Sequence, residues 1–233
     1  MNRPMKYLSQ ALLLIALAAL PAFAAGGGWA PYVEAKTGGA YEQIGSIKNT
    51  TNVANPAAVN KTSVDDVVGV VGAAAGVSLK SWGVPMRAEA EYAYHTNLAY
   101  NPNPTFIAAG VPTSLKSDVT SHTLFANLYY DFETGTAFTP YVGVGLGAAW
   151  NYTKSKGTVI ATGQSADYDR DTLNLAWNVG AGCAYTLSDN WKLTTGYRYV
   201  DLGKVVWGEK SDGQLTSKDI TTHEVLLGLR YQF

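Results

Sequence analysis

The sequence predicts an all-β protein, an eight-stranded antiparallel up-and-down transmembrane β-barrel. Three observations predict it. Stretches of about ten residues alternate between apolar and polar side chains, as strands do when their two faces meet different media. These stretches are joined by short turns and long polar connections in strict alternation. Beyond the first 24 residues, no apolar run approaches the roughly 20 residues that a transmembrane helix needs.

The N-terminus has the three parts of a signal peptide. Residues 1–6 form a basic start, residues 11–20 form a short apolar centre, and small residues lead to Ala24. We expect cleavage after Ala24, so that residues 1–24 are a signal peptide and residues 25–233 form one barrel domain with four long surface loops.

Composition excludes several classes of function. The formal net charge is −1, and export would remove Arg3 and Lys6, so the chain lacks the basic excess that nucleic-acid binding needs. Cys183 is the only cysteine, which excludes an internal disulfide and a cysteine metal cluster. The sequence also lacks a clustered set of metal ligands. We therefore expect no metal, no cofactor and no nucleic-acid partner.

The first four predicted strands each combine an apolar face with a polar or small one. Glu34 and Lys36 share a face of the first strand, and the second alternates small residues with valine. In the third strand Arg87, Glu89 and Glu91 lie opposite apolar and tyrosine side chains. The fourth alternates leucine and aromatic residues with polar ones. These strands span residues 29–38, 67–79, 86–95 and 121–132.

The last four predicted strands continue the pattern. The fifth alternates valine, leucine and tryptophan with glycine, and this alternation continues through the glycines without leading into a helix, which excludes a nucleotide-binding loop. We expect these glycines to leave room for long side chains from other strands. The eighth strand has an apolar face that ends in Tyr231 and Phe233, opposite Glu224 and Arg230. These strands span residues 140–150, 173–187, 191–200 and 221–233.

Long and short connections alternate along the chain, so the long ones gather at one end of the barrel and both termini at the other. Short turns are typical of the periplasmic end of outer-membrane barrels and long loops of the outer end. The long connections are residues 39–66, 96–118, 153–171 and 202–219. The short turns are residues 80–85, 133–136 and 188–190.

Alternation alone fits two barrels, a lipocalin-like one with its apolar face inward and an outer-membrane one with that face toward lipid. Three observations favour the membrane: the asymmetry of the loops, the aromatic residues at both ends of the strands, and charges that complement one another if they face inward. Residues expected in the two aromatic girdles are Tyr130, Phe132, Tyr185, Tyr231 and Phe233 at the short-turn end, and Tyr92, Tyr94, Trp150 and Tyr197 at the other.

We predict that eight inward charges form an ion network in the lumen. The first and last strands must be neighbours, so Glu34 can pair with Arg230, and Arg198 can pair with Glu224 on the last two strands. Eight strands leave an interior just wide enough for side chains to fill, which favours a polar core; a gated ion path through rearranged pairs is the alternative. The predicted network is Glu34, Lys36, Arg87, Glu89, Glu91, Arg198, Glu224 and Arg230.

Five segments resemble the small outer-membrane barrel superfamily that includes opacity-type surface proteins and the OmpA-type barrel. They are residues 87–92 (RAEAEY), 127–132 (NLYYDF), 140–147 (PYVGVGLG), 197–203 (YRYVDLG) and the terminal 228–233 (GLRYQF). The resemblance covers the strand framework and leaves out the loops.

The resemblance implies a Gram-negative outer membrane, contact with its lipid and lipopolysaccharide, and a terminal strand that the barrel-assembly machinery reads as its insertion signal, with Tyr231 and Phe233 as the matching residues. Members are often surface antigens or adhesins that bind a host or surface ligand through their loops. Because no second domain follows the barrel, we expect no peptidoglycan anchor.

Some eight-stranded outer-membrane barrels are lipid A deacylases or acyltransferases, so a lipid A-modifying enzyme is a further alternative. Such an enzyme needs a nucleophile and a base within reach of each other. Ser121 adjoins His122, but neighbours along a strand point to opposite faces. We therefore expect His95, His122 and His223 to lie in the polar interface or at loop bases, and we assign no catalytic residue.

Overall fold

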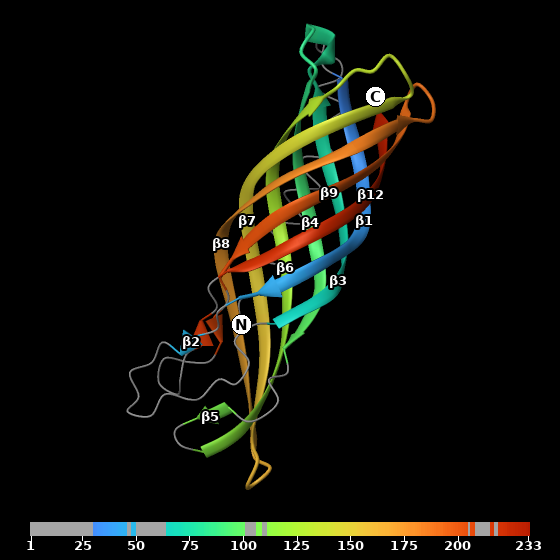
Figure 1. The fold of residues 1–233 in the computed structure, drawn as a ribbon. Coiled ribbons are helices and arrows are strands. Elements are labelled where there is room, and N and C mark those ends of the chain that lie inside the picture. Colours follow the sequence, from blue (N-terminus) through green and yellow to red (C-terminus); the bar gives the residue numbers. More distant parts are fainter. Residues whose placement is uncertain are drawn as a thin grey trace.

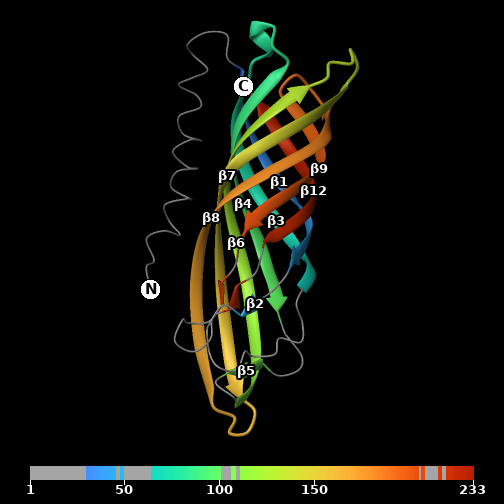
Figure 2. The ribbon, with the colours of Figure 1, turned by 60° about the vertical axis from the view of Figure 1, so that its left-hand side comes forward.

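Eight long strands close into a single antiparallel barrel in the computed structural model (Figures 1 and 2). The structure describes residues 30–45, 48–49, 64–100, 106–108, 111–204, 206–207, 215–216 and 219–233. The predicted signal peptide lies outside these residues. The barrel strands are β1 (Ala30–Ile44), β3 (Val64–Ser78), β4 (Met86–Tyr100), β6 (Val111–Asp131), β7 (Phe138–Val159), β8 (Ser165–Thr186), β9 (Trp191–Gly203) and β12 (Ile220–Gln232).

Each strand pairs with its neighbours in the chain, and β1 pairs with β12 to close the barrel. The closing register places Tyr32 opposite Gln232 and Ile44 opposite Ile220. Complete closure matters because an unpaired strand edge cannot be solvated in lipid. The fold predicted from the sequence is therefore confirmed.

Short elements decorate the two ends of the barrel. At the long-loop end, β5 (Phe106–Ala108) pairs with β6, and β2 (Lys48–Asn49), β10 (Val206–Trp207) and β11 (Leu215–Thr216) form a separate small sheet. At the other end, the short 3-10 helix η1 (Lys80–Trp82) lies in the turn after β3 and is followed by Gly83, whose φ of 76° suits glycine. No helix in the described part of the chain is long and apolar enough to cross a membrane.

The three short turns lie where they were predicted, but the long connections are shorter than predicted. Residues 160–164 alone separate β7 from β8, so the predicted loop 153–171 is wrong. In the other three long connections the strands also continue: β1 reaches Ile44, β4 reaches Tyr100, β6 begins at Val111 and β9 reaches Gly203. The predicted loops 39–66, 96–118 and 202–219 otherwise lie partly outside the described residues.

The strands continue because backbone pairing does not need an apolar face. Thr153, Lys154, Ser155 and Lys156 each pair with β8, yet they carry no apolar period. Lys154 and Lys156 are exposed on one face, and the other face presents the polar side chains of Thr153 and Ser155, which are buried. Residues 165–176 of β8 extend past its pairing with β9, a length of roughly 40 Å at about 3.4 Å per residue. Figure 2 shows β6, β7 and β8 projecting beyond the other strands at this end.

Apolar side chains cover the outer surface between two aromatic belts. On β12, Val225, Leu227 and Leu229 are 58%, 54% and 43% exposed. Ring pairs mark the short-turn belt, with Trp191 4.9 Å from Tyr231 and Phe138 4.8 Å from Tyr185. The opposite belt holds Tyr92, Tyr94, Tyr197 and Tyr199 against two histidines. On β12 the belts are about nine residues apart, the span that a tilted transmembrane strand needs.

Candidate functional site: the ion network in the lumen

Inward-facing glycines make the lumen wide enough for long polar side chains. A Cβ on Gly143 would lie 2.3 Å from the Tyr129 ring, and one on Gly145 would lie 2.1 Å from Oδ1 of Asn127. On β8, a Cβ on Gly180 would lie 2.7 Å from Cβ of Arg198. The expectation that the glycines of the fifth predicted strand leave space for other strands is confirmed.

Glu34 and Arg230 form an ion pair across the seam between β1 and β12. They are register partners, and Arg230 Nη2 lies 2.8 Å from Glu34 Oε2. Arg230 Nε donates to the same oxygen at 2.8 Å, and Thr194 Oγ1 on β9 donates to Glu34 Oε1 at 2.6 Å. Both charged side chains are buried, so the pair replaces the hydration that each has lost.

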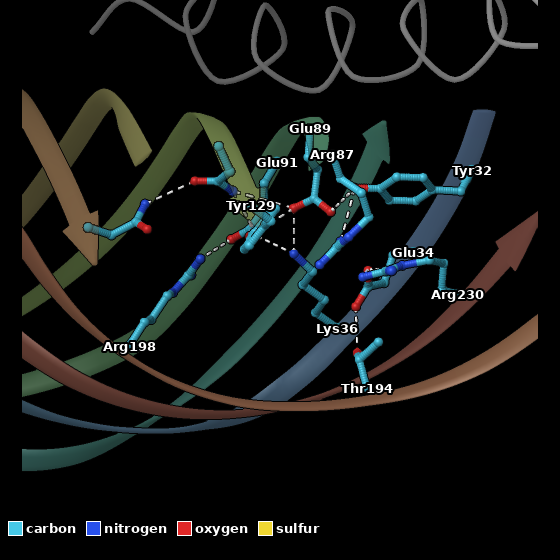
Figure 3. Close-up of polar contacts among 12 residues, drawn as sticks. Tyr32, Glu34, Lys36, Arg87, Glu89, Glu91, Tyr129, Thr194, Arg198 and Arg230 are labelled. Carbon is cyan, nitrogen blue, oxygen red and sulfur yellow. Dashed lines mark hydrogen bonds and ion pairs between the residues drawn. The ribbon is translucent and has the colours of Figure 1, made fainter. Parts of the chain in front are cut away.

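Lys36 joins two glutamates on β4, the strand beyond its neighbour β3 (Figure 3). Its Nζ donates to Glu89 Oε1 at 2.6 Å and to Glu91 Oε2 at 2.5 Å. Between them β3 presents small residues to the lumen, including Ala74, which pairs with both Glu34 and Glu91. The long side chain of Lys36 on β1 can therefore extend over the small residues of β3 to reach the glutamates on β4.

Arg198 on β9 extends the network toward the long-loop end. Its Nη1 lies 2.5 Å from Glu91 Oε1, and its Nε donates to Glu224 Oε2 at 2.6 Å. The other Glu224 oxygen lies 2.8 Å from His95 Nε2. These contacts cross the lumen between Glu91 and His95 on β4 and Arg198 and Glu224 on β9 and β12.

Arg87 lies at the short-turn end of the network inside a group of tyrosines. Its Nε donates to both oxygens of Asp131, at 3.0 and 2.8 Å. Its guanidinium carbon lies 4.5 Å from the Tyr129 ring centroid and 5.1 Å from that of Tyr141, within cation–π range. Tyr32 accepts from Arg87 Nη1 at 3.3 Å and donates to Glu89 at 2.9 Å, which links the two groups.

An apolar layer lies beyond the ions at the long-loop end. Ile44, Leu98, Leu202 and Ile220 face inward and are fully buried. A register shift in β4 after His95 turns Leu98 toward the lumen as well. The layer belongs to a buried apolar cluster of Ala40, Ile44, Val68, Val70, Ala93, Leu98, Val119, Phe125, Ala149, Ala176, Val200, Leu202 and Ile220.

Within the network the lumen contains a small polar cavity. It has a volume of about 40 Å³, a few times what one water molecule needs. It lies between Glu34, Lys36, Asn178, Thr194 and Arg198. This space admits a few waters among the ions and is too small for an organic ligand.

All eight residues of the predicted network face the lumen, and each has an ionic partner there. Arg87 pairs with Asp131, a residue that had not been included although it shares a strand face with Asn127. The two histidines outside the lumen bind tyrosines: His122 Nδ1 lies 2.7 Å from Tyr92 Oη, and His223 Nδ1 lies 2.6 Å from Tyr197 Oη.

The prediction for His95 is wrong. It is fully buried and bound to Glu224 instead of lying at the polar interface or a loop base. The signal was available, because His95 follows Arg87, Glu89 and Glu91 at period two on the same strand face. The tyrosines of the lumen were also missed, although Tyr32 stands two residues before Glu34.

A closed barrel with an apolar, aromatic-rimmed outer surface and a polar lumen is a transmembrane β-barrel of the outer-membrane class. The chain belongs to the outer membrane protein beta-barrel domain family, whose sequence model matches residues 10–233. It is accordingly a protein of the cell outer membrane, in contact with the lipid of that membrane.

The chain is also similar to individual proteins of known sequence or structure. The chain is 26% identical over 213 residues to outer membrane protein PagN of Salmonella typhimurium, covering 87% of this chain and 89% of that protein. It is 38% identical over 63 residues to the 31 kDa outer-membrane immunogenic protein of Brucella melitensis, covering 27% of this chain and 26% of that one. The structure of Ail, the attachment invasion locus protein of Yersinia pestis, is similar with a TM-score of 0.46 and 15% identity, covering 87% of this chain and 99% of Ail.

Proposed function

We propose that this protein is a surface interaction protein, adhesin- or antigen-like, which binds a host or surface ligand through the part of the chain beyond the outer aromatic belt. The observation that supports this proposal most directly is the length of β6, β7 and β8. These strands have 21, 22 and 22 residues, whereas β9 and β12 have 13 each. A barrel that served only as an anchor needs no such projection. The Brucella melitensis relative is named as immunogenic, which is consistent with exposed loops.

In this proposal the lumen is a structural polar core. The ion pairs of Glu34, Lys36, Glu91, Arg198 and their partners fill the space between the strands, and the apolar layer of Ile44, Leu98, Leu202 and Ile220 lies beyond them. Charged groups without such partners would be costly to bury. The ions thus serve to hold the barrel closed and rigid beneath its loops.

The test is a cell-surface binding screen with wild type and four loop variants. For the β7–β8 ribbon, residues 152–171 are replaced by Asn-Gly, because Asn151 and Thr172 are register partners that a two-residue turn can join. The other three variants shorten residues 46–63, 101–110 and 205–218. Binding lost in one variant, with normal surface display, supports the proposal. If the wild-type protein binds none of the cell types or matrix components in the screen, the proposal fails and a structural role in the membrane remains.

A gated ion path is the second candidate, and the polar cavity of about 40 Å³ is the observation that favours it. Opening it would require the ion pairs and the apolar layer to rearrange together. Planar-bilayer recording of purified protein tests this candidate. A reproducible conductance that changes in Arg230→Ala or Glu34→Ala would replace the structural role of the network with a transport role.

A lipid A-modifying activity has little support from the geometry. Ser121 faces the lumen and donates to Asn151 at 2.8 Å, whereas His122 faces the outer surface and binds Tyr92. The two cannot act as nucleophile and base on one substrate. Mass spectrometry of lipid A from cells with and without the protein checks this, and a changed acylation pattern would make the enzyme the leading candidate.

We further propose that Tyr231 and Phe233 form the signal that the barrel-assembly machinery reads. Phe233 is half exposed on the outer surface, and its ring contacts that of Tyr231 edge-on at 5.1 Å. Its backbone N–H donates to Pro31 O at 3.0 Å, so the terminal residue still takes part in the closing seam.

A further inference from the structure

A second, larger cavity lies at the short-turn mouth of the barrel, where Arg87 and Arg230 of the lumen network form part of its wall. Its volume is about 150 Å³, an order of magnitude more than one water molecule needs. The turn after β3, the turn after β6 and the adjoining ends of β9 and β12 enclose it. Its lining is polar and includes Lys80, Arg87, Asp131, Glu133, Lys192 and Arg230.

Four cations line this cavity, against two carboxylates. Lys80 pairs with Glu133 at 2.8 Å, and Arg87 pairs with Asp131 at 2.8 Å. Arg230 is paired deeper in the lumen with Glu34. Among the described residues, Lys192 has no carboxylate within ion-pair distance, so the mouth of the barrel carries an excess of positive charge.

Lys192 is moreover placed directly opposite another cation. It is the register partner of Arg230 across β9 and β12, and both side chains face inward and line the cavity. Like charges in directly opposed positions of an antiparallel pair destabilise it. A bound anion would offset this repulsion, because it can contact both cations at the rim of the water-accessible cavity.

We propose that this cavity is a binding site for a compact oxyanion, a phosphate or a phosphate-bearing small molecule, held by Lys192 and the adjoining face of Arg230. A lysine ammonium and a guanidinium together match the several acceptor oxygens of such a group. The hydroxyl of Thr139 on β7, which also lines the cavity, is a further donor. The volume accommodates a phosphate group with part of the molecule that bears it.

The position of the site indicates the source of the ligand. Lys192 faces the lumen, whereas its neighbour Trp191 is 41% exposed on the outer surface and contacts Tyr231 in the aromatic belt. The cavity therefore opens to the water at the short-turn end and not to the lipid side. By the orientation of the family barrel that end is periplasmic, so we assign the site to a soluble phosphate compound of the periplasm. A phospholipid headgroup carries the same phosphate chemistry, and the experiment below distinguishes this source from a soluble phosphate compound.

Titration calorimetry and thermal unfolding of the refolded barrel in maltoside micelles, with inorganic phosphate as the probe, test the proposal. Wild type is expected to bind phosphate saturably, with an unfolding midpoint that rises with phosphate and not with sodium chloride at matched ionic strength. Lys192→Ala is expected to bind at least about tenfold more weakly, as for loss of a charge-assisted contact. The control Lys116→Ala, an exposed lysine at the far end of β6, is expected to retain wild-type binding.

Lys192→Ala also separates binding from folding. Because it removes one of two opposed like charges, it is expected to be at least as stable as wild type in phosphate-free buffer, and its midpoint is expected not to respond to phosphate. A second set of micelles contains anionic phospholipid and no free phosphate. A Lys192-dependent rise there, with none from inorganic phosphate, would overturn the soluble source in favour of a headgroup. No saturable response to either, or an equal response in Lys192→Ala, would overturn the site itself.

Discussion

Glu34 and Arg230 face each other at the seam where the first strand of the barrel meets the last. They are separated by 196 positions in the chain and by 2.8 Å in space, from Arg230 Nε to Glu34 Oε2. Every other seam of the barrel joins strands that are close in sequence. The inward ion pair therefore reinforces the seam that joins the two ends of the barrel sequence.

Arg230→Ala is expected to destabilise the barrel by about 3–5 kcal/mol, because it leaves the buried Glu34 carboxylate without its cation. Urea unfolding in micelles, followed by tryptophan fluorescence, measures the change. Lys80→Ala is the matched control, since Lys80 and Glu133 form an exposed pair worth about 0–1 kcal/mol. A loss below about 1 kcal/mol in Arg230→Ala would mean that water replaces the arginine without cost.

Gly143→Ala is expected to cost about 1–3 kcal/mol, because its methyl group would lie 2.3 Å from the Tyr129 ring, which must then move off Arg87. Gly39→Ala on β1 is the control, because a Cβ there meets only Val68 O at 3.9 Å. The two unfolding curves are compared under identical conditions. Equal stability of the two variants would show that the lumen is loosely packed around Tyr129.

The alternation of residue types predicts which side chains share a strand face, and it placed eight charged residues on the lumen side. Glu34 with Arg230 and Arg198 with Glu224 lie on adjacent strands, so their pairing followed from strand order. The contacts of Lys36 with Glu89 and Glu91 could not be predicted in the same way. They cross β3, and they depend on the stagger of the strands and on the small residues that β3 presents.

The ends of the strands could not be predicted, because the signal used was the apolar period and that period stops at the membrane surface. Lys154 is the register partner of Asp118 and Asp169, and Lys156 is that of Lys116 and Asp167, so charged residues recur on the solvated face of the ribbon above the membrane. Because both faces of such a strand carry polar side chains, its sequence pattern resembles that of a polar loop. His95 was misplaced for a related reason: it directly precedes the predicted loop 96–118, although it also lies on the charged face of its strand.

Val144→Arg is expected to destabilise the protein by about 2–4 kcal/mol, since Val144 is 55% exposed on the outer surface between the belts and the change puts a charge into lipid. Ile160→Arg is the control. Ile160 is 57% exposed at the tip of the β7–β8 hairpin, where arginine remains in water, and we expect a change within about 0.5 kcal/mol. Folding into lipid vesicles, scored by heat-modifiable migration on gels, gives the two free energies. Similar losses in both variants would contradict the assignment of the outer surface to lipid.

Deletion of Phe233 is expected to lower the amount of protein in the outer membrane several-fold while leaving refolding in vitro nearly unchanged. The reason is that the ring is half exposed and contributes little packing, whereas a terminal aromatic residue is what the assembly machinery is proposed to recognise. Phe138→Ala is the control, because Phe138 is 55% exposed in the same aromatic belt, against Tyr185, and is not terminal. Quantitative blotting of outer-membrane fractions and refolding yields in micelles are measured for both variants. If the deletion and Phe138→Ala reduce membrane levels equally, Phe233 acts as a belt residue and not as a signal.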